Sequence, residues 1–406
     1  MINKVIHHIE LSHTSPHISG GEKALVEIVR YLNKNTNTSQ VIYTSESGKE
    51  VYCKHLGTIS TKIKFIVIGS KKIEKINEYL AYYLRVFQVL NKTIKFPNNK
   101  KNIIFSHEEF LPTLLYSWIL KKRNMNARWI AFFHMKCPSI WRGFEGEYTG
   151  KFKRPSIRII RYKLEQWLFF KLTKKNISKV ITVNSCYLGF LNNIYKDAYS
   201  LKIFGGESVY AIKNYSGVKS VGESNFKNKF DLCFMARFHE QKGVFELIDI
   251  LKRLKKHKPD ISLALIGGGV RRVESKFFKL IKDKKLEKNI KYFGYVTGNK
   301  KFSILKSSKI FLFPSYYESF GQVVLEAMKC GLPVVSYNLP PFNVFKRGII
   351  KVPVLDNEKM TDEIIKLLSD NNYYEKIKKE ALDFSSDFSW DKTGEEICNL
   401  INKLVI

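Results

Sequence analysis

The sequence lacks any long apolar segment. A membrane-spanning helix needs about 20 predominantly apolar residues in a row, and no uncharged apolar run reaches that length. The segment Met1–Glu10 has the pattern of a strand. It lacks the charged region followed by an apolar one that marks a secretory signal peptide. We therefore expect a cytoplasmic protein without a signal peptide or a transmembrane helix.

Cysteine is scarce, and its spacing excludes the common disulfide and metal-binding patterns. The six cysteines form no CxxC pair and no zinc-type spacing with histidine. They are Cys53, Cys137, Cys186, Cys233, Cys330 and Cys398. We interpret them as reduced thiols of a cytosolic protein, mostly small buried hydrophobic side chains.

Acidic residues are few compared with basic ones. The chain has 37 Asp+Glu against 69 Lys+Arg, a net charge of +32. A charge of this size bears on partners rather than on the fold. It fits nucleic acid, an anionic membrane surface or phosphorylated small molecules, and it equally fits a lysine-rich bias spread over solvated faces. With 44% hydrophobic residues the chain can fill sizeable cores, which excludes general disorder.

Apolar patterns typical of strands and helices alternate along the chain. In the first half, strands are expected at 5–9, 41–43, 64–68, 103–106, 128–133 and 180–183, with helices at 22–33, 77–90 and 112–122. Residues 214–229 are rich in Ser, Gly, Asn and Lys and are interpreted as a linker. In the second half, strands are expected at 231–235, 261–266, 290–293, 310–313 and 334–335. The alternation predicts an α/β fold with two Rossmann-like domains facing across a cleft.

One segment carries most of the information about function, the residues from Phe313 to Pro333. A strand ends at Phe313, a loop carries Glu318, and a helix opens at Gly321 and ends near Gly331. The first N–H groups of a helix have no partner within it. Those near this helix start can therefore donate to sugar hydroxyls or phosphate oxygens.

Here the sequence resembles a known family. Glu318 and Glu326 match the E-x7-E motif of retaining glycosyltransferases of the GT-B type, most closely family 4 (glycosyl transferases group 1). The surrounding Ser319-Phe320-Gly321 and Gly331-x-Pro333 also match. The resemblance implies two Rossmann-like domains, with a C-terminal helix that crosses back to the N-terminal domain. It divides the chain into an acceptor-binding domain (1–213), a linker (214–229), a nucleotide-sugar-binding domain (230–385) and a closing helix (386–406).

Other motifs of this family follow in the expected order in the second half. Arg237 and Lys242 match an R-x4-K-G element whose cations clamp the donor diphosphate. Such cations offset the charge gained when the leaving group departs. Gly267 and Gly269 match a glycine turn that lets backbone approach a nucleotide, and Val296 lies in the element that often faces the base.

In the first half, the resemblance is carried by two strand ends. Gly20-Gly21 with Glu22 resembles the family's GG-x-E loop, whose backbone amides reach a phosphate or the acceptor. His134 matches a strand-terminal histidine near the reacting sugar. His107 and Glu108 end an earlier strand and are expected on the acceptor side, and Asn214 matches an asparagine before the linker.

The resemblance thus implies a hexosyltransferase-type enzyme that moves a sugar from a nucleoside-diphosphate sugar to a saccharide or lipid-linked acceptor, with retention and without a metal or other cofactor. No DxD motif occurs at a plausible position. The expected catalytic residues are Glu318, Arg237, Lys242 and His134. The expected donor-binding residues are Gly20, Gly21, Arg237, Lys242, Gly267, Gly269, Val296, Glu318, Ser319, Phe320, Gly321 and Glu326. The sequence departs from the family after Val335, where Pro340-Pro341-Phe342-Asn343 replaces a Gly-Gly pair followed by Glu.

A basic, aromatic segment at 151–175 points to a further partner. It carries nine Lys and Arg against one Glu. Five apolar residues share a helical face, with Phe169 and Phe170 nearby: Ile157, Ile160, Leu164, Trp167 and Leu168. This composition is typical of helices on anionic membranes, so peripheral contact with the inner face of a membrane is expected. A core-facing helix with a basic solvent side is the alternative.

Two other functions fit part of the pattern. A non-hydrolysing nucleotide-sugar epimerase has the same double-Rossmann architecture, but the Glu318-Ser319-Phe320-Gly321 context favours a transferase. A nucleic-acid-binding protein would fit the charge. It predicts a recognisable binding module, which the sequence lacks, so no nucleic-acid partner is expected.

Overall fold

The computed structural model describes residues 4–13, 18–92, 94–97, 99–152, 154–197, 209–213, 215–217, 229–269 and 271–404. The chain divides into two compact units. The first comprises 1–140, 156–216 and 390–406, and the second comprises 141–155 and 217–389. Asn214 and most of the predicted linker lie outside the described residues.

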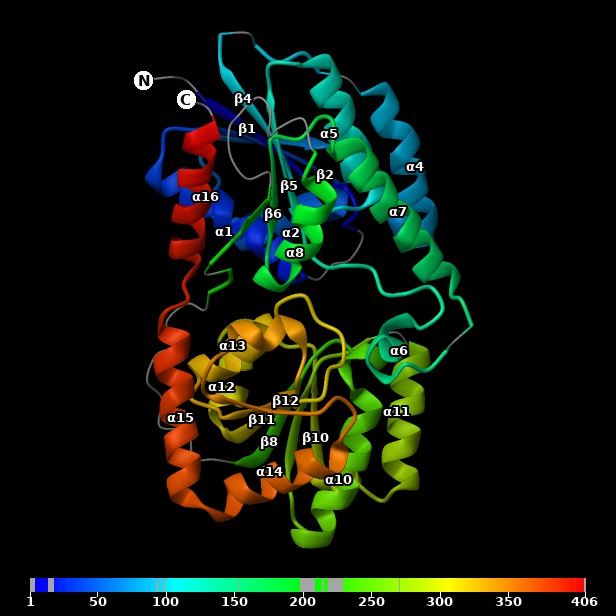
Figure 1. Cartoon of the computed structure of the whole chain (residues 1–406), viewed down its shortest axis with the longest axis vertical. Coiled ribbons are helices and arrows are strands. Elements are labelled where there is room, and N and C mark those ends of the chain that lie inside the picture. The colour runs from blue at the N-terminus through cyan, green and yellow to red at the C-terminus, as the bar shows by residue number, and fades with distance from the viewer. Residues whose placement is uncertain are drawn as a thin grey trace. The chain divides into compact units, whose positions relative to one another are not determined.

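The first unit is built on a parallel sheet that has seven strands among the described residues, in the order β3-β2-β1-β4-β5-β6-β7 (Figure 1). The strands are β1 (Lys4–Ile9), β2 (Ser39–Thr44), β3 (Ile63–Val67), β4 (Lys101–Ser106), β5 (Arg128–Phe133), β6 (Lys179–Thr182) and β7 (Val209–Ala211). Its helices are α1 (Gly20–Asn35), α2 (Glu46–Leu56), α3 (Lys71–Ile76), α4 (Glu78–Asn91), α5 (Leu111–Arg123), α7 (Ile157–Thr173), α8 (Leu188–Tyr195) and α16 (Trp390–Leu404). Strands β1, β4 and β5 are buried over almost their whole length, as expected for parallel strands covered on both faces.

The last helix, α16, packs against α1 in the first unit. Gly394 allows the close approach, because a Cβ at this position would lie 2.3 Å from the Tyr31 ring. Lys4 Nζ donates to Asn402 Oδ1 at 2.6 Å, and the Tyr210 hydroxyl donates to Glu396. The end of the chain therefore belongs to the core of the unit that its beginning forms.

The second unit has a parallel sheet of six strands within its described residues, in the order β10-β9-β8-β11-β12-β13. The strands are β8 (Phe230–Met235), β9 (Leu263–Ile266), β10 (Ile290–Gly294), β11 (Ser308–Phe313), β12 (Val334–Tyr337) and β13 (Ile349–Val352). The helices are α6 (Gly143–Thr149), α10 (Val244–His257), α11 (Arg271–Asp283), α12 (Gly298–Lys306), α13 (Gln322–Lys329), α14 (Asn357–Ser369) and α15 (Asn371–Ser386). The strand order of each unit is the Rossmann order, with a reversal between β1 and β4 and between β8 and β11.

The structure corrects one part of the predicted domain division. The segment 141–155 was assigned with the N-terminal domain, yet it groups with the second unit. The Phe144 ring packs edge-to-face on Tyr317, with ring centroids 4.8 Å apart. A contact between positions so far apart in sequence has no local signal. The short elements α3, β7 and β13 and the helix α2 were also not predicted, because three to six residues or a weak apolar stripe give little periodicity.

Candidate functional site

The candidate site of the second unit lies at the carboxyl ends of β8 and β11. These strands are neighbours, and the strand order reverses between them. Open parallel sheets bind ligands outside such a reversal. Lys242 comes after β8 and Glu318 after β11, so two of the predicted residues belong to the two loops that border this point.

These two residues form an ion pair. Lys242 Nζ lies 2.5 Å from Glu318 Oε1, and the Glu318 side chain is 8% exposed. A buried carboxylate needs such a partner, because burial removes its hydration. Gly243 allows the loops to meet: it has a φ of +72°, and a Cβ there would lie 2.0 Å from the Pro314 carbonyl oxygen. The structure therefore brings together two predicted catalytic residues from distant positions in the chain.

Neighbouring polar groups hold the pair in place. Ser315 Oγ donates to Glu318 Oε1 at 2.8 Å and lies 3.0 Å from the Gln241 carbonyl oxygen. The Tyr316 N–H donates to the same carbonyl at 3.0 Å. Gln241 Nε2 lies 3.4 Å from the Tyr317 carbonyl oxygen. Backbone and side-chain hydrogen bonds near the ion pair thus join the loop after β8 to the loop after β11.

The predicted glycine turn follows β9, next to β8. Gly267 has a φ of +134°, and a Cβ there would lie 1.8 Å from the Ala236 carbonyl oxygen. A Cβ at Gly269 would lie 2.4 Å from the Phe238 carbonyl oxygen. Both glycines are therefore required by the close approach of two backbone segments, and the turn lies directly against the loop that carries Arg237.

Arg237 and Val296 lie at the ends of the two strands beside this turn. Arg237 is two residues beyond β8 and is exposed, and Val296 is two residues beyond β10 and half-buried. An exposed guanidinium at a strand end is accessible to a phosphate group of a ligand.

The residues after Glu318 form the start of α13. Ser319 is half-buried, Phe320 is buried, and Gly321 has a φ of +91°. A Cβ at Gly321 would lie 2.8 Å from the ring of Phe342. The segment that departs from the family pattern, residues 340–343, therefore places a buried aromatic ring on this glycine.

Glu326 lies about one turn into α13 and is paired with a different lysine. Lys301 Nζ on α12 lies 2.7 Å from Glu326 Oε1, and the carboxylate is 6% exposed. Glu318 and Glu326 are thus both buried carboxylates paired with lysine, but with different ones. Neither Lys301, which is 25 positions away on a separate helix, nor Ser315 was predicted from the sequence.

In the first unit, the structure brings His134 and Gly21 together. His134 follows β5, and its Nε2 would lie 3.3 Å from a Cβ at Gly21 in the first turn of α1. Gly20 is the first residue of that helix and is exposed. His134 Nε2 lies 2.9 Å from the His107 carbonyl oxygen. Since a carbonyl only accepts, this nitrogen carries the proton.

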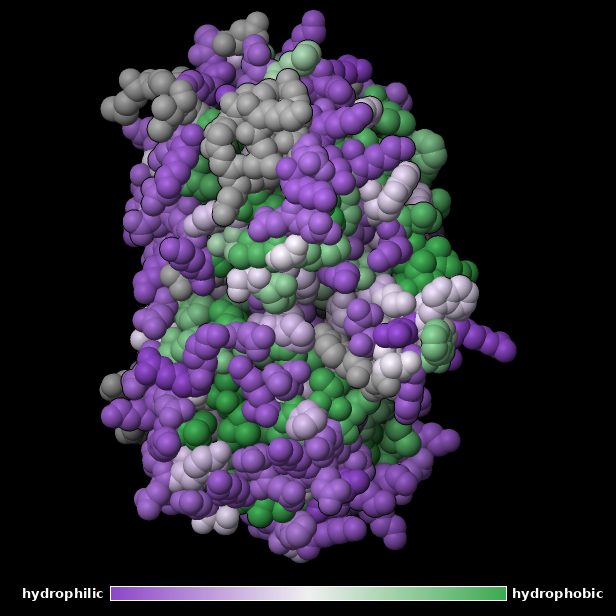
Figure 2. All heavy atoms as spheres, viewed as in Figure 1, coloured by the Kyte–Doolittle hydropathy of each residue, from purple (hydrophilic) through white to green (hydrophobic). Residues whose placement is uncertain are grey.

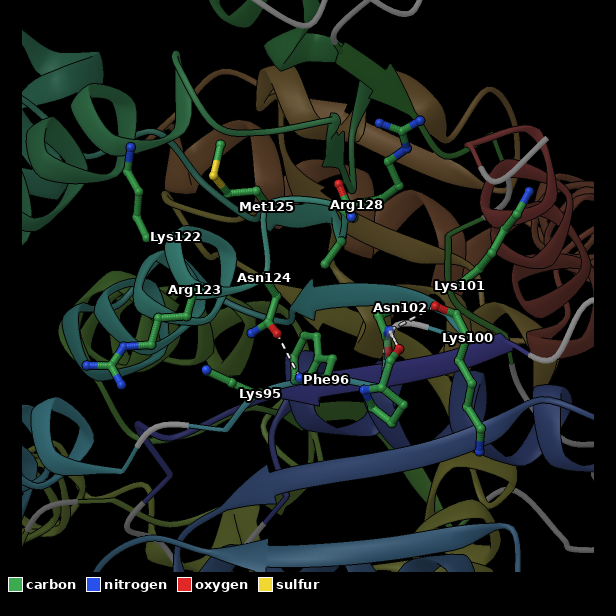
Figure 3. Close-up of a pocket in the computed structure, with 13 residues that line it drawn as sticks. Lys95, Phe96, Lys100, Lys101, Asn102, Lys122, Arg123, Asn124, Met125 and Arg128 are labelled. Carbon is green, nitrogen blue, oxygen red and sulfur yellow. Dashed lines mark hydrogen bonds between the residues drawn. The ribbon is translucent and has the colours of Figure 1, made fainter.

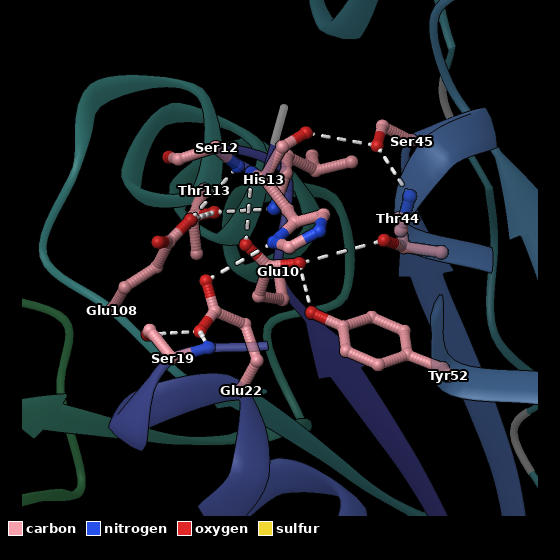
Figure 4. Close-up of polar contacts among 12 residues, drawn as sticks. Glu10, Ser12, His13, Ser19, Glu22, Thr44, Ser45, Tyr52, Glu108 and Thr113 are labelled. Atoms are coloured by element: carbon pink, nitrogen blue, oxygen red, sulfur yellow. Dashed lines mark hydrogen bonds and ion pairs between the residues drawn. The ribbon is translucent and has the colours of Figure 1, made fainter. Parts of the chain in front are cut away.

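A dense polar cluster surrounds the loop after β1 (Figure 4). Glu10 accepts from the His13 N–H at 3.1 Å and from the Tyr52 hydroxyl. Glu22 accepts from His13 Nδ1 at 3.1 Å, and Glu108 accepts from the Ser12 N–H at 2.9 Å. Glu108 had been placed on the acceptor side from the sequence, whereas Glu10 and His13 had no signal there. Within the described residues, no group of three His, Cys, Asp or Glu side chains is arranged for a metal ion.

Burial controls the ionisation of this cluster. It raises the pKa of Glu10, and it raises the pKa of Glu108 well above the usual value, where the charge of Glu10 adds to the effect. Burial also opposes ionisation of Glu22, but the hydrogen bond and charge of His13 outweigh it and lower its pKa. Burial and the neighbouring His8 hold the pKa of His107 well below its usual value, which keeps it neutral. The cluster therefore holds fewer charges than its composition implies.

The family of the second unit follows from comparison with known proteins. Residues 219–384 match the family model for glycosyl transferases group 1. This part of the chain is a group 1 glycosyltransferase domain. The matched range contains the Lys242–Glu318 pair, the glycine turn and the Lys301–Glu326 pair of the second unit.

Relatives of the whole chain are named as glycosyltransferases. An uncharacterized glycosyltransferase of Methanocaldococcus jannaschii is 25% identical over 403 residues, 96% of this chain and 96% of its own length. The 2-deoxystreptamine N-acetyl-D-glucosaminyltransferase of Niallia circulans is 23% identical over 326 residues, 73% of this chain and 81% of its own length. The chain is thus similar over most of its length to proteins named as glycosyltransferases.

Solved structures confirm the predicted GT-B fold class. The Anabaena protein HepE in complex with UDP and glucose has a TM-score of 0.69 and 16% identity, covering 98% of this chain and 99% of that one. Sucrose-phosphate synthase from Thermosynechococcus elongatus has a TM-score of 0.71 and 16% identity, covering 99% of both chains. At this identity the likeness concerns the fold.

Proposed function

We propose that this glycosyltransferase moves a sugar, with retention of anomeric configuration, from a nucleoside-diphosphate sugar to a saccharide or lipid-linked acceptor. The observation that carries the proposal is the Lys242–Glu318 pair at the strand-order reversal of the group 1 domain. A half-buried lysine beside a buried carboxylate offers one group to phosphate oxygens and one to sugar hydroxyls. The binding of UDP by HepE, named in its complex with glucose, supports a donor of this class.

In the proposed reaction, Arg237 and Lys242 bind the donor diphosphate and stabilise its charge as it departs. The bond between the anomeric carbon and the diphosphate oxygen breaks, and a bond to the acceptor oxygen forms on the same face. The acceptor's proton passes to the leaving phosphate oxygen. Glu318 holds hydroxyls of the donor sugar, and Glu326 holds the ribose. Catalysis then comes largely from the orientation of donor and acceptor and from the positive charges already in place at Arg237 and Lys242.

Other predicted residues complete the proposal. The turn Gly267–Gly269 and Val296 approach the nucleotide, and Ser319–Gly321 offers backbone N–H groups at the start of α13. The backbone amides of the Gly20–Gly21 turn contribute to donor binding, and His134 lies near the reacting sugar. No metal is included, because Arg237 and Lys242 supply the positive charge that a divalent ion would otherwise provide.

A thermal-shift panel of nucleotide sugars tests this proposal. We expect at least one donor to raise the melting temperature, and Arg237→Ala and Glu318→Ala each to weaken that response. Lys252→Ala, on the exposed face of α10, is the control and should respond like the wild type. Wild-type responses from both site variants would refute the site. Donor consumption that needs no acceptor would favour an epimerase, and an NMR spectrum of the product reports retention.

We further propose that the first unit binds an anionic membrane surface. Four of the five residues predicted to share a face of α7 are exposed: Ile157 by 85%, Ile160 by 37%, Leu164 by 61% and Trp167 by 58%. The fifth, Leu168, is half-buried and packs on the core together with the buried Phe169. Helix α7 therefore has a core-facing side, as the alternative expected, and a second apolar side that is exposed. The predicted segment 151–175 is divided, since 151–155 belongs to the second unit.

Helix α4 extends this surface, which the sequence did not indicate. The Tyr82 hydroxyl donates to Glu165 at 2.9 Å and so joins α4 to α7. Exposed apolar side chains follow the outer face of α4, namely Tyr79, Leu80, Tyr83, Phe87 and Leu90. Figure 2 shows hydrophobic residues gathered over these two helices. Lys171 lies 4.8 Å from the Trp167 ring centroid, the arrangement of a cation beside an interfacial aromatic.

Flotation with vesicles tests the membrane contact. We expect salt-sensitive binding to phosphatidylglycerol vesicles and none to neutral ones, because the cations bind anionic headgroups. Phe87→Ser with Trp167→Ser should remove most binding, whereas Ile59→Ser, at another exposed apolar position of the first unit, should not. Within the described residues, no helix is both long and apolar enough to cross a bilayer, so any such contact would be peripheral.

A further inference from the structure

The first unit contains a cavity of about 670 Å³ at the amino-terminal ends of β4 and β5 (Figure 3). Lys101 and Asn102 of β4 and Arg128 of β5 form one wall. The end of α5 with the following turn, and the segment after α4, form the others. Nothing in the proposed transfer reaction uses this cavity.

The lining is strongly basic. Six of its thirteen residues are Lys or Arg, and none is Asp or Glu. The six are Lys95, Lys100, Lys101, Lys122, Arg123 and Arg128. In the whole chain 69 of 406 residues are Lys or Arg, so a general lysine bias does not account for this concentration. Figure 3 shows these side chains spread around the cavity from several segments.

Four of the six cations have no carboxylate partner in the part of the chain that the structure describes. They are Lys95, Lys100, Lys122 and Arg123. Arg128 Nε lies 3.2 Å from the Leu404 carbonyl oxygen. Like charges around one concavity raise each other's energy, and a multivalent anion relieves the repulsion.

Two asparagines fix the walls independently of the charged side chains. Asn124 Oδ1 accepts from the Phe96 N–H at 2.7 Å, and its Nδ2 donates to the carbonyl oxygens of Ile94 and Leu120. This joins the segment after α4 to the end of α5. These hydrogen bonds hold the backbone segments that line the cavity in place, as a preorganised binding site requires.

Asn102 makes the second set of contacts. Its Nδ2 donates to the Pro97 and Lys100 carbonyl oxygens, both at 3.0 Å, and its Oδ1 lies 3.1 Å from His7 Nε2. In the turn after α5, Lys121 Nζ donates a hydrogen bond to the Met125 carbonyl oxygen at 2.6 Å. Lys122 and Arg123 are thus not needed to close that turn.

The cavity is remote from the polar cluster of the same unit. It lies at the start of β4 and β5, while His107 and His134 follow their ends. A six-residue strand is about 17 Å long. The cavity is therefore a separate feature and not an extension of the acceptor-side residues.

We propose that this cavity is a second anion-binding site, for a ligand that carries phosphate or diphosphate groups. Its volume lies within the usual range for small-molecule sites. Lysine and arginine side chains on a fixed backbone suit phosphate oxygens. The group is carried either by a phospholipid headgroup or by a soluble phosphorylated molecule. The inference does not depend on the proposed transfer reaction.

Inorganic pyrophosphate tests the site by titration calorimetry of the full chain. Arg237→Ala is included as a background, so that phosphate binding in the second unit is weakened. We expect residual binding that Lys100→Gln with Arg123→Gln weakens by at least about tenfold, since hydrogen bonds to charged groups are lost. Lys252→Gln with Lys256→Gln, an equal charge change on exposed positions of α10, should leave it unchanged.

Vesicles of phosphatidylcholine with and without phosphatidylglycerol distinguish the two ligand sources. If the pocket variant also loses binding to the anionic vesicles, the ligand is a headgroup. If only pyrophosphate binding changes, the ligand is soluble. Absence of residual pyrophosphate binding, or equal weakening by the control variant, would overturn the proposal. Failure of nucleotide sugars to bind would refute the transfer proposal and leave this measurement unaffected.

Discussion

Lys242 Nζ lies 2.5 Å from Glu318 Oε1, although the two residues are 76 positions apart in the chain. They follow β8 and β11, the neighbouring strands between which the strand order of the second unit reverses. Both side chains are largely buried, so each charge depends on the other. This pair links the stability of the group 1 domain to the chemistry proposed for it.

Loss of the lysine alone should destabilise the second unit. We expect Lys242→Met to cost about 3 kcal/mol, because the buried Glu318 carboxylate loses the cation that balances its charge. Adding Glu318→Gln should restore most of this stability but not donor binding. Differential scanning calorimetry and the donor thermal-shift response measure the two effects. A double variant as unstable as Lys242→Met alone would show that the pair is not the cause.

The glycine turn after β9 offers a matched comparison between neighbours. We expect Gly267→Ala to destabilise the second unit by more than about 3 kcal/mol, because its Cβ would overlap the Ala236 carbonyl oxygen at a positive φ. At Gly268 the nearest atom to an added Cβ is the flexible end of Glu274, at 3.2 Å. Gly268→Ala should therefore cost less than about 1 kcal/mol. Equal melting temperatures for the two variants would contradict this account.

Tyr162 should act as a positioning residue for His134. Its hydroxyl lies 2.8 Å from the Met135 carbonyl oxygen and 3.2 Å from Glu109, whose other oxygen lies 3.4 Å from the His134 N–H. We expect Tyr162→Phe to cost about 1 kcal/mol of stability and to lower kcat about fivefold, while the KM for donor changes little. Tyr79→Phe, at an exposed position of α4, serves as the control. A KM effect without a kcat effect would exclude the positioning role.

Buried histidines should make the first unit sensitive to acid. Burial lowers the pKa of His7 to about 4 and that of His8 to about 3. In the unfolded chain they take up protons near pH 6.5, so the unfolded state binds more protons at lower pH. The stability that the neutral histidines contribute is present above pH 6.5 and is lost as pH falls towards 4.

The variant His7→Gln isolates one of these groups. It keeps a polar atom near Asn102 but cannot titrate, so the fall of stability between pH 6.5 and 4 should be shallower by up to about 1.4 kcal/mol per pH unit. His257→Gln, an exposed histidine at the end of α10, should leave the slope unchanged. Urea unfolding at a series of pH values measures both. An unaltered slope in His7→Gln would mean that this histidine is not buried in its neutral form.

The elements near the candidate site were predictable because their signals are local. The strand that ends at Phe313, the loop with Glu318 and the helix that starts beside Gly321 follow from apolar runs broken by proline and glycine. The same holds for β8 before Arg237. In contrast, Lys301 lies on a different helix from its partner Glu326, and no spacing within the sequence connects them.

The sequence by itself determined the two alternating series of strands and helices, the residues that follow each strand, and the family of the second unit. These depend on periodicity and on short motifs, which neighbouring residues establish among themselves. Only the tertiary structure decided which strand ends meet, that Lys242 pairs with Glu318, that the apolar face of α7 is exposed beside α4, and that six cations line one cavity. Those relationships join residues far apart in the chain, and strand order with close packing brings them together.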